Sequence, residues 1–238
     1  MDPSLAGDLD NIRYPLHLID FETVKWVVPS LPNSSAHLSI PFQWSCHILE
    51  APGATPEHRE FLYRGGDDPR SEFASTLLEC VRPAATVGIY THYELTVINE
   101  LVNQGVPHAD ELRQILAERV LDLKKMVEAR VYLREFKGSL SLKSVLPALS
   151  FGHGYDDLRI RDGEAASAEY KRMCAVTTRQ EDAEQIAQDL LAYCKRDTEA
   201  MVVLLDALRN LVQPGAPVAT SAEPEPDDLI HEQLALNL

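Results

Sequence analysis

The sequence predicts an α/β fold in which a mixed β-sheet is flanked by α-helices in one compact domain. Three observations predict it. Three extended apolar segments follow one another early in the chain, helical and extended patterns then alternate, and the last part is helical. Strands joined by turns pair antiparallel, whereas strands joined by helices pair parallel. We therefore expect three antiparallel strands, then alternating helix and strand, then helices.

Three strands are expected in the first third of the chain. Residues 15–22 are typical of a buried strand, and the Pro, Asn and Ser residues within 29–35 indicate a loop after it. The segment IPFQWSCHILE, residues 40–50, is rich in aromatic and β-branched residues and predicts the second strand. A Pro-Gly turn at 52–53 leads to the third, EHREFLYR, residues 57–64.

Helices and strands alternate over the middle of the chain. An apolar stripe with a period of about 3.6 residues predicts a helix that Pro83 ends. The stripe consists of Phe73, Leu77, Leu78 and Val81. Residues 85–93 are expected to form a short buried strand, and Gly105 to end the amphipathic helix that follows. A further helix covers about 110–119, and RVLDLKKMV, residues 119–127, predicts a fifth strand or a strand–helix junction.

The last part of the chain is predicted to be helical. SLKSVLPALS, residues 141–150, resembles a short helix, and residues 163–175 and 180–212 have helical patterns. The composition beyond Pro214 predicts disorder, because it offers few apolar groups to bury. The expected organisation is a lead-in, an α/β domain and a disordered acidic tail, at residues 1–13, 14–212 and 213–238.

Composition limits the class of protein. Of 238 residues, 45% are hydrophobic and 25% are charged, as in ordinary soluble globular proteins. No stretch approaches the roughly 18 apolar residues of a membrane span, and the start MDPSLAGDLDNIRYPL lacks the features of a secretory signal. We therefore expect a cytoplasmic location and no membrane. The cysteines form no CxxC pair, so reduced thiols are expected rather than a disulfide framework or a zinc or iron–sulfur site; they are Cys46, Cys80, Cys174 and Cys194.

The formal net charge of the chain is −15. Tight non-specific binding of nucleic acid is disfavoured, because affinity for phosphates comes largely from Lys and Arg. Part of the charge lies in the tail, residues 213–238, which has acidic residues and no Lys or Arg. A metal-dependent enzyme that meets its substrate transiently remains compatible with this charge.

Two carboxylates interrupt the first predicted strand. Asp20 and Glu22 are two residues apart, so they project from one face, roughly 6–7 Å apart along the chain. Near the C-terminus, YCKRD places Tyr193 and Asp197 on one helical face, because they are four residues apart. Asp197 then either points toward the sheet or pairs with a nearby Lys or Arg on the surface.

Two further acids lie beside apolar segments. Glu94 follows a buried strand and starts a helix, where the helix dipole alone favours an acid. Asp122, in VLDLKK, is either a site residue or an acid at a strand edge or helix cap. Carboxylates crowd at the end of an apolar strand when divalent cations neutralise them, and Mg²⁺ and Mn²⁺ prefer oxygen ligands. Two such ions, about 3.5–4 Å apart, can stabilise both the attacking and the leaving oxygens of a phosphodiester.

With these acids, the sequence resembles the DEDD 3′–5′ exonucleases of the ribonuclease-H-like superfamily, in particular the DEDDy branch. IDFET matches the Asp-x-Glu of its first motif, and YCKRD matches the Tyr-x-x-x-Asp of its last. More narrowly, YPLHLIDFETV, IPFQWSCHI, SLKSVLPAL and DGEAASAEY resemble a bacterial family, domain of unknown function 2779. The resemblance runs from about Tyr14 to Leu211. It implies a ribonuclease-H-like fold for residues 14–212.

The resemblance also implies roles for individual residues. Asp20, Glu22 and Asp197 are expected to hold one Mg²⁺ or Mn²⁺, with Asp20 bridging to a second ion. Glu94 stands where the superfamily normally has Asp and is expected to hold the second ion directly or through water. Tyr193 is expected to orient the attacking water. The residues expected near the substrate are Phe21, His92, Asp122 and Lys143.

The expected activity is hydrolysis of single-stranded DNA or RNA from its 3′ end, with two metal ions. Residues 121–143 are locally basic with interleaved aromatic residues, which suits either a single strand or an ordinary solvated helix face. Family members often carry a RecB-like nuclease module ahead of this domain. The implied partners are therefore nucleic acid and a RecB-like module or a DNA-repair protein, and the chain is a stand-alone form or a fragment. The alternatives are a weak or inactive module that binds nucleic acid or a nuclease, and a phosphoesterase for small nucleotides.

Overall fold

The computed structural model describes residues 2–26, 38–65, 67–149 and 154–212. Within these residues one mixed sheet contains five strands, Leu16–Lys25 (β1), Ser39–Leu49 (β2), Glu57–Leu62 (β3), Thr86–Ile89 (β4) and Val120–Asp122 (β5). Their order is β3-β2-β1-β4-β5. The pairs β1–β2 and β2–β3 are antiparallel, whereas β1–β4 and β4–β5 are parallel. The predicted mixed α/β sheet is confirmed.

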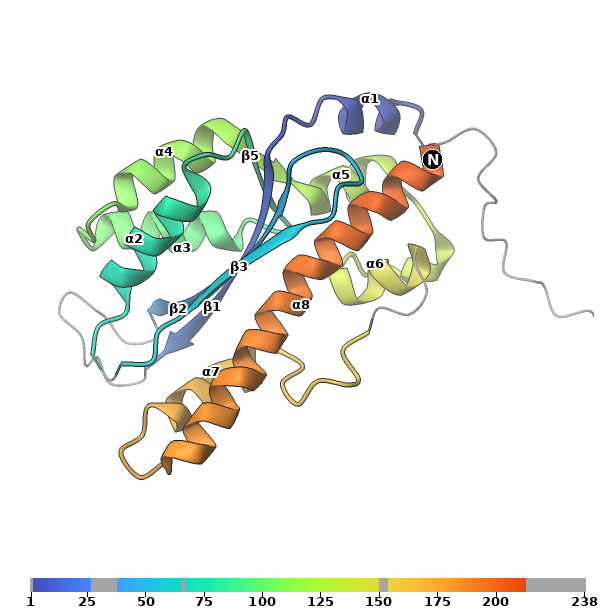
Figure 1. The fold of residues 1–238 in the computed structure, drawn as a ribbon. Coiled ribbons are helices and arrows are strands. Elements are labelled where there is room, and N and C mark those ends of the chain that lie inside the picture. Colours follow the sequence, from blue (N-terminus) through green and yellow to red (C-terminus); the bar gives the residue numbers. More distant parts are fainter. Residues whose placement is uncertain (1, 27–37, 66, 150–153, 213–238) are drawn as a thin grey trace, which may run out of the picture.

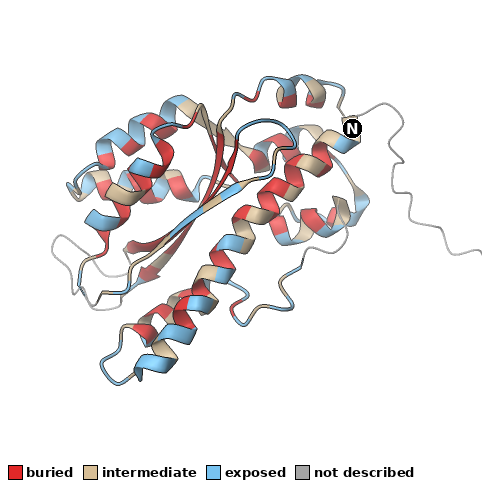
Figure 2. Ribbon diagram, in the orientation of Figure 1, coloured by how far each residue is buried: buried red, intermediate tan, exposed pale blue. Residues whose placement is uncertain are grey.

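Helices cover both faces of this sheet (Figure 1). They are Ser4–Asp10 (α1), Arg70–Val81 (α2), Tyr93–Asn103 (α3), Ala109–Arg119 (α4), Leu123–Arg130 (α5), Leu142–Leu149 (α6), Gly163–Met173 (α7) and Gln180–Val212 (α8), with a 3₁₀ turn at Arg134–Phe136 (η1). The long helix α8 crosses one face diagonally, with α7 beside its start, and α2, α3 and α4 lie on the other face (Figure 1). In Figure 2 the strands β1 and β2 are mostly buried between these layers, whereas β3 at the edge of the sheet is exposed or half-buried.

The alternation of side chains along β1 divides the core between the two faces. Leu16 and Leu18 pack with residues of α1, α5, α6 and α8. Ile19 and Phe21 pack with residues of α2, α3 and α4. Successive residues of a strand point to opposite faces, so β1 is buried on both sides and its apolar composition follows from its central position.

Gly88 of β4 leaves room for the side chain of Leu18, its neighbour on β1 in the parallel ladder. A Cβ atom built on Gly88 would lie 2.5 Å from Cδ2 of Leu18, which is closer than side chains tolerate. The pairing of β1 with β4 matters for the site. The two strands run parallel, so their carboxyl ends lie at the same edge of the sheet. Asp20 and Glu22 of β1 and the start of α3 after β4 are therefore brought to one edge.

Polar side chains of β2 hold α8 against the sheet. Gln43 donates from Nε2 to the carbonyl oxygen of Leu190 over 2.9 Å. Farther along, Ser45 Oγ and His47 Nδ1 each lie 2.8 Å from Oγ1 of Thr198. These buried hydrogen bonds lie at both ends of the segment that carries Tyr193 and Asp197, so they fix which side of α8 faces β1.

The predicted elements mostly correspond to observed ones. The region 119–127 is a junction of β5 and α5, and the strand expected at 85–93 is shorter, Thr86–Ile89. The lead-in contains a helix that the sequence did not predict: α1 is only seven residues long, but Leu5 and Leu9 are buried in the core. Packing rather than propensity therefore stabilises it. The predicted loop at 29–35 and the acidic tail lie outside the described residues.

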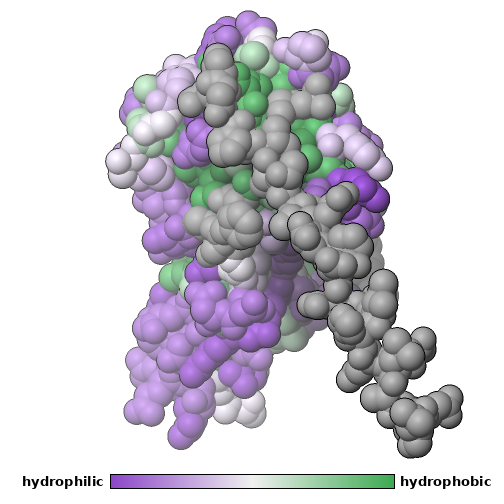
Figure 3. All heavy atoms as spheres, turned by 90° about the vertical axis from the view of Figure 1, so that its right-hand side faces the viewer, coloured by the Kyte–Doolittle hydropathy of each residue, from purple (hydrophilic) through white to green (hydrophobic). Residues whose placement is uncertain are grey.

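All four cysteines are free, as expected. Among the described residues, no helix has both the length and the apolar character needed to cross a membrane. On the face shown in Figure 3, hydrophilic residues dominate the lower part and hydrophobic residues gather in the upper part.

Candidate functional site

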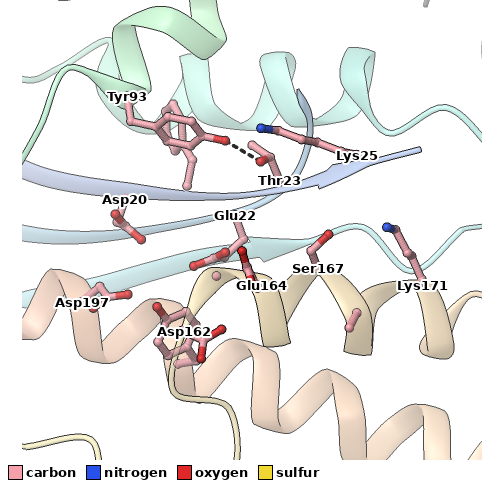
Figure 4. Close-up of a pocket in the computed structure, with 14 residues that line it drawn as sticks. Asp20, Glu22, Thr23, Lys25, Tyr93, Asp162, Glu164, Ser167, Lys171 and Asp197 are labelled. Carbon is pink, nitrogen blue, oxygen red and sulfur yellow. Dashed lines mark hydrogen bonds between the residues drawn. The ribbon is translucent and has the colours of Figure 1, made fainter. Parts of the chain in front are cut away.

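A pocket of about 790 Å³ opens at the edge of the sheet where β1 ends. The second half of β1 forms one wall, α7 forms another, and Tyr93 of α3 and Tyr193 and Asp197 of α8 complete it. In Figure 4 the carboxylates of Asp20, Glu22 and Asp197 gather at one end of this pocket. Acids that are 177 residues apart in the sequence therefore meet in one place.

Asp20 and Glu22 form the centre of the acidic cluster. They lie next to Ser45 and Gln43 of β2 in the antiparallel ladder, and the register shifts between Glu22 and Thr23. Such an irregularity increases the local twist of a strand and is common beside active sites. One carboxyl oxygen of each acid and Sγ of Cys194 all lie within 4.8 Å of one another. Two carboxylates at this separation repel each other unless they share a proton or a cation.

Asp197 faces the cluster rather than the solvent. Tyr155 donates its hydroxyl to Oδ1 of Asp197 over 2.6 Å. Of the basic residues that could have paired with Asp197 on the surface, which are Lys195, Arg196 and Arg172, Arg196 pairs with Asp157 and Arg172 with Glu169. The helical phase of α8 therefore directs Asp197 toward β1.

Glu94 is the most isolated acid of the group. It lies in the first turn of α3, where the helix dipole favours a negative charge, but its side chain is only 3% exposed. Its Oε2 is buried and has no hydrogen-bond partner among the residues that the structure describes. Burial raises the pKa of Glu94 to about 7, and the charges of Asp122 and Asp197 add to the rise. A buried carboxyl oxygen without a partner indicates a place for a proton or a cation.

The acids raise one another's pKa. Burial, followed by the charge of Asp197, raises the pKa of Glu22 to about 8. Burial, Asp197 and Glu94 likewise raise the pKa of Asp20 well above its usual range. The pKa of Asp197 is also raised by burial, although the hydrogen bond from Tyr155 opposes this rise. A cluster whose pKa values are shifted by both burial and like charge is a typical functional site.

The donor set suits hard divalent cations. Carboxylate oxygens are the ligands that Mg²⁺ and Mn²⁺ prefer. Cys194 is the exception, but burial and the nearby acids raise its pKa well above the usual range, so it stays a thiol and donates to the backbone oxygen and to Oδ2 of Asp20. The four carboxyl groups of Asp20, Glu22, Asp197 and Glu94, one of which has the unpartnered oxygen, therefore fit one or two such ions.

Tyr193 lies beside these acids with its hydroxyl protonated. It is buried, and burial together with the charge of Asp197 raises the pKa of Tyr193 far above its ordinary value. Its hydroxyl also hydrogen-bonds to Asp197. A phenol with a raised pKa serves as a donor that orients a neighbour, and not as a base.

Helix α7 contributes pocket residues that the sequence did not indicate. Asp162 caps this helix by accepting from the backbone N–H of Ala165 over 2.8 Å, as expected for an N-cap. It also lines the pocket, and its charge raises the pKa of Glu22. Along α7, the pocket residues Glu164, Ser167, Ala168 and Lys171 follow the spacing of one helical face. That spacing was the available signal; Tyr155, in a segment without periodicity, gave none.

Two lysines also line the pocket. Figure 4 shows Lys171 of α7 on the far side of Ser167 from Glu22, whereas Lys25 of β1 extends on the side of Thr23 and Tyr93. Nζ of Lys171 also lies 5.6 Å from the ring centre of Trp26, within the range of a cation–π contact. One pocket therefore has both acidic and basic side chains in its lining.

The remaining predicted residues occupy different positions. Phe21 lines the pocket but is 4% exposed and packs edge-on against Phe73. His92 is exposed and pairs with Asp122 over 3.3 Å, and Asp122 also caps α5 by accepting from the N–H of Lys125. Neither His92 nor Asp122 is among the residues that line this pocket.

Lys143 lies outside the pocket lining but close to the acids. Its Nζ is 4.6 Å from the ring centre of Tyr155, 5.2 Å from that of Tyr193, and 3.5 Å from the Tyr193 hydroxyl. Its charge lowers the pKa of both Glu22 and Asp197 and so opposes the effect of burial. Lys143 therefore supplies part of the positive charge that the acids require.

Comparisons with known proteins identify one family. The family described as Domain of unknown function (DUF2779) matches residues 17–141, which include Asp20, Glu22 and Glu94 but not Tyr193 or Asp197. No curated protein and no solved structure matches the chain.

Proposed function

The chain belongs to the DUF2779 family, and we propose that it is a metal-dependent 3′–5′ exonuclease with a ribonuclease-H-like fold. The observation that carries this proposal is the meeting of Asp20, Glu22 and Asp197 in one pocket, with Glu94 buried beside them and one of its oxygens unpartnered. A sheet of three antiparallel strands extended by two parallel ones supports the same assignment, since the resemblance to the DEDDy exonucleases implies this arrangement.

Each residue has a role in the proposed reaction. Asp20, Glu22 and Asp197 would hold one Mg²⁺ or Mn²⁺, and Asp20 and Glu94 would hold a second. Bound there, the ions would supply an activated water and stabilise the charge that develops on the phosphate oxygens. Tyr193, whose hydroxyl keeps its proton, would orient that water by hydrogen bonding. Tyr155 and Cys194 would position Asp197 and Asp20, respectively.

The lysines of the pocket suit a polyanion rather than a single small nucleotide. If the scissile phosphate lies at the acids, the next part of the nucleic-acid backbone would lie along α7 toward the pocket lysines Lys25 and Lys171. The pocket volume of about 790 Å³ falls within the range of roughly 300–1,000 Å³ that is typical of ligand sites. A pocket of this size has room for a terminal nucleotide. This favours hydrolysis at the end of a nucleic-acid strand.

The test is a gel assay on oligonucleotides labelled at the 5′ or the 3′ end, with Mn²⁺ or Mg²⁺ present. The wild-type protein should shorten the 5′-labelled strand progressively and release labelled mononucleotide from the 3′-labelled strand. Asp20→Asn and Asp197→Asn should lower the rate at least a hundredfold. Asp189→Asn is the matched control, because Asp189 lies on the same helix but pairs with Arg159. Equal shortening by all variants, or none by the wild type, would refute the proposal.

One observation favours a second candidate, a weak or inactive module that binds nucleic acid. Lys143 already provides a positive charge near Glu22 and Asp197, which reduces the need for a metal. Calorimetric titration with Mn²⁺ separates the candidates. A nuclease should bind Mn²⁺ and lose this binding in Asp20→Asn, whereas a binding module should hold oligonucleotides equally well with and without the metal.

A further inference from the structure

A second cluster of metal-ligating side chains lies on the opposite face of the sheet from the acids. His17 comes from β1, Cys46 from β2 and Cys80 from α2. In the β1–β2 ladder Cys46 is paired with Ile19, and alternation places His17 on that same face. Cys46 and Cys80 pack in the core beneath α2, α3 and α4. The carboxylates point to the other face, toward α8, so the two clusters are distinct.

The three side chains are almost completely removed from solvent. His17 is 1% exposed, Cys46 is 0% exposed and Cys80 is 3% exposed. Nδ1 of His17 is buried and, within the described part of the chain, has no hydrogen-bond partner. Leaving a buried polar atom unpaired costs about 1–3 kcal/mol, so native proteins rarely do so without a reason. The incomplete hydrogen bonding of this ring is the second observation, beside the close approach of the ligand atoms, that points to a ligand in this part of the core.

The separations of the ligand atoms suit a single small ion. One ring nitrogen of His17 and the two sulfur atoms all lie within 4.8 Å of one another. Around a tetrahedral zinc ion, with Zn–S of about 2.3 Å and Zn–N of about 2.0–2.1 Å, ligand atoms are roughly 3.4–3.8 Å apart. The cluster would therefore need to contract by at most about 1.4 Å per pair, within the reach of side-chain rotations.

The charges and the softness of the ligands identify the class of ion. Two thiolates and a neutral imidazole around a divalent cation sum to zero charge, which the apolar surroundings require. Thiolates select zinc-like ions over the hard ions that carboxylates prefer. Among the described residues, no fourth His, Cys, Asp or Glu joins this cluster at the same separation. The described side chains would thus supply three of the ligands of such an ion.

We propose that His17, Cys46 and Cys80 form a buried site for one thiophilic divalent ion of the Zn²⁺ class, which links β1 and β2 to α2. This site is independent of the proposed nuclease activity. A metal at this position would act on the stability of the sheet, because its ligands come from three separate elements and would be held together only in the folded state.

The test uses the full chain, produced without a histidine tag in zinc-supplemented medium and desalted in the presence of Mg²⁺. We expect about one Zn²⁺ per chain, and X-ray absorption spectra with two sulfur atoms and a nitrogen in the first shell. Chain refolded with Co²⁺ should show the sulfur-to-cobalt charge-transfer bands of a tetrahedral site. Cys46→Ala and Cys80→Ala should lower the metal content at least tenfold, whereas Cys174→Ala, at a half-buried cysteine elsewhere, should not.

The spectrum of the wild-type protein decides the matter even if the variants fail to fold. A first shell with one sulfur and several oxygens would place the ion at Asp20, Glu22 and Cys194 and overturn the proposal. A shell without sulfur, or a wild-type chain that contains no zinc after zinc-replete production, would overturn it equally. The two proposals fail separately: if the wild-type chain binds zinc through sulfur but shows no nuclease activity, the proposed nuclease function fails and the zinc site stands.

Discussion

Replacing Glu22 with Gln should stabilise the metal-free protein at neutral and alkaline pH. In the unfolded chain a glutamate loses its proton near pH 4.5, whereas in the fold its pKa is about 8. Between these values the folded state binds more protons than the unfolded state, so wild-type stability falls as pH rises from about 4.5 to about 8. Glutamine has no proton to lose and keeps nearly the same shape, so the variant avoids this loss.

The magnitude follows from the shift in pKa. A rise from 4.5 to about 8 corresponds, at about 1.4 kcal/mol per unit, to a cost on the order of 5 kcal/mol above pH 8. Asp20, Glu94 and Asp197 titrate in the same cluster as Glu22. Removing the charge of Glu22 therefore also lowers the pKa of these acids, and the whole cost cannot be assigned to Glu22 alone. We therefore expect Glu22→Gln to raise the free energy of unfolding by about 2–5 kcal/mol at pH 8.5, with little change at pH 5.

The assay is urea unfolding in EDTA at a series of pH values, with Glu164→Gln as the control. Glu164 lines the same pocket but is exposed to solvent rather than buried among the acids. Adding Mn²⁺ should reverse the order, because the wild type gains a ligand-bound state that Glu22→Gln forms poorly. If wild type and Glu22→Gln have the same pH dependence in EDTA, the side chain of Glu22 is not held among buried acids, and the reasoning for a metal site fails.

Three further predictions concern residues around the carboxylates. Tyr193→Phe should lower kcat about tenfold to a hundredfold in the gel assay while Mn²⁺ affinity stays unchanged; an equal loss of Mn²⁺ binding would mean that Tyr193 shapes the metal site instead. Changing both Lys25 and Lys171 to Ala should raise KM for oligonucleotides, and reduce the slope of log KM against log salt by about 1.4, as expected for two phosphate contacts with a single strand; an unchanged slope would exclude both lysines from the substrate path. Thr198→Val should lower the free energy of unfolding by about 1–3 kcal/mol, because His47 loses its buried partner and Ser45 keeps only His58; unchanged urea stability would contradict the anchoring of α8 by β2.

Much of the fold was predictable from local patterns. Alternation in IDFET placed Asp20 and Glu22 on one face of a strand, and the four-residue spacing in YCKRD placed Tyr193 and Asp197 on one face of a helix. These patterns are informative because side-chain direction within a strand or helix depends on backbone geometry alone. For the same reason the Asp162 cap was recognisable before its position in the pocket was known.

Other features depended on contacts between distant segments. Helix α1 is too short to form through propensity, and it exists because Leu5 and Leu9 are buried and Arg130 pairs with Asp2 and Asp8. The role of Tyr155 beside Asp197 had no sequence signal, since its segment has no periodicity. Cysteine spacing argued against a zinc site, yet β1, β2 and α2 bring His17 and two cysteines together.

The sequence by itself determined which acids share a face of their own element, and that the chain folds as strands followed by helices around a mixed sheet. Only the tertiary structure decided that these faces meet: parallel pairing of β1 with β4 brings Glu94 to the edge of Asp20 and Glu22, and the bonds from β2 to α8 turn Asp197 toward them. The physical reason is that the direction of a side chain within its own helix or strand is set by the local backbone geometry. The burial and mutual repulsion that shift the pKa values of these acids arise only when separate elements pack.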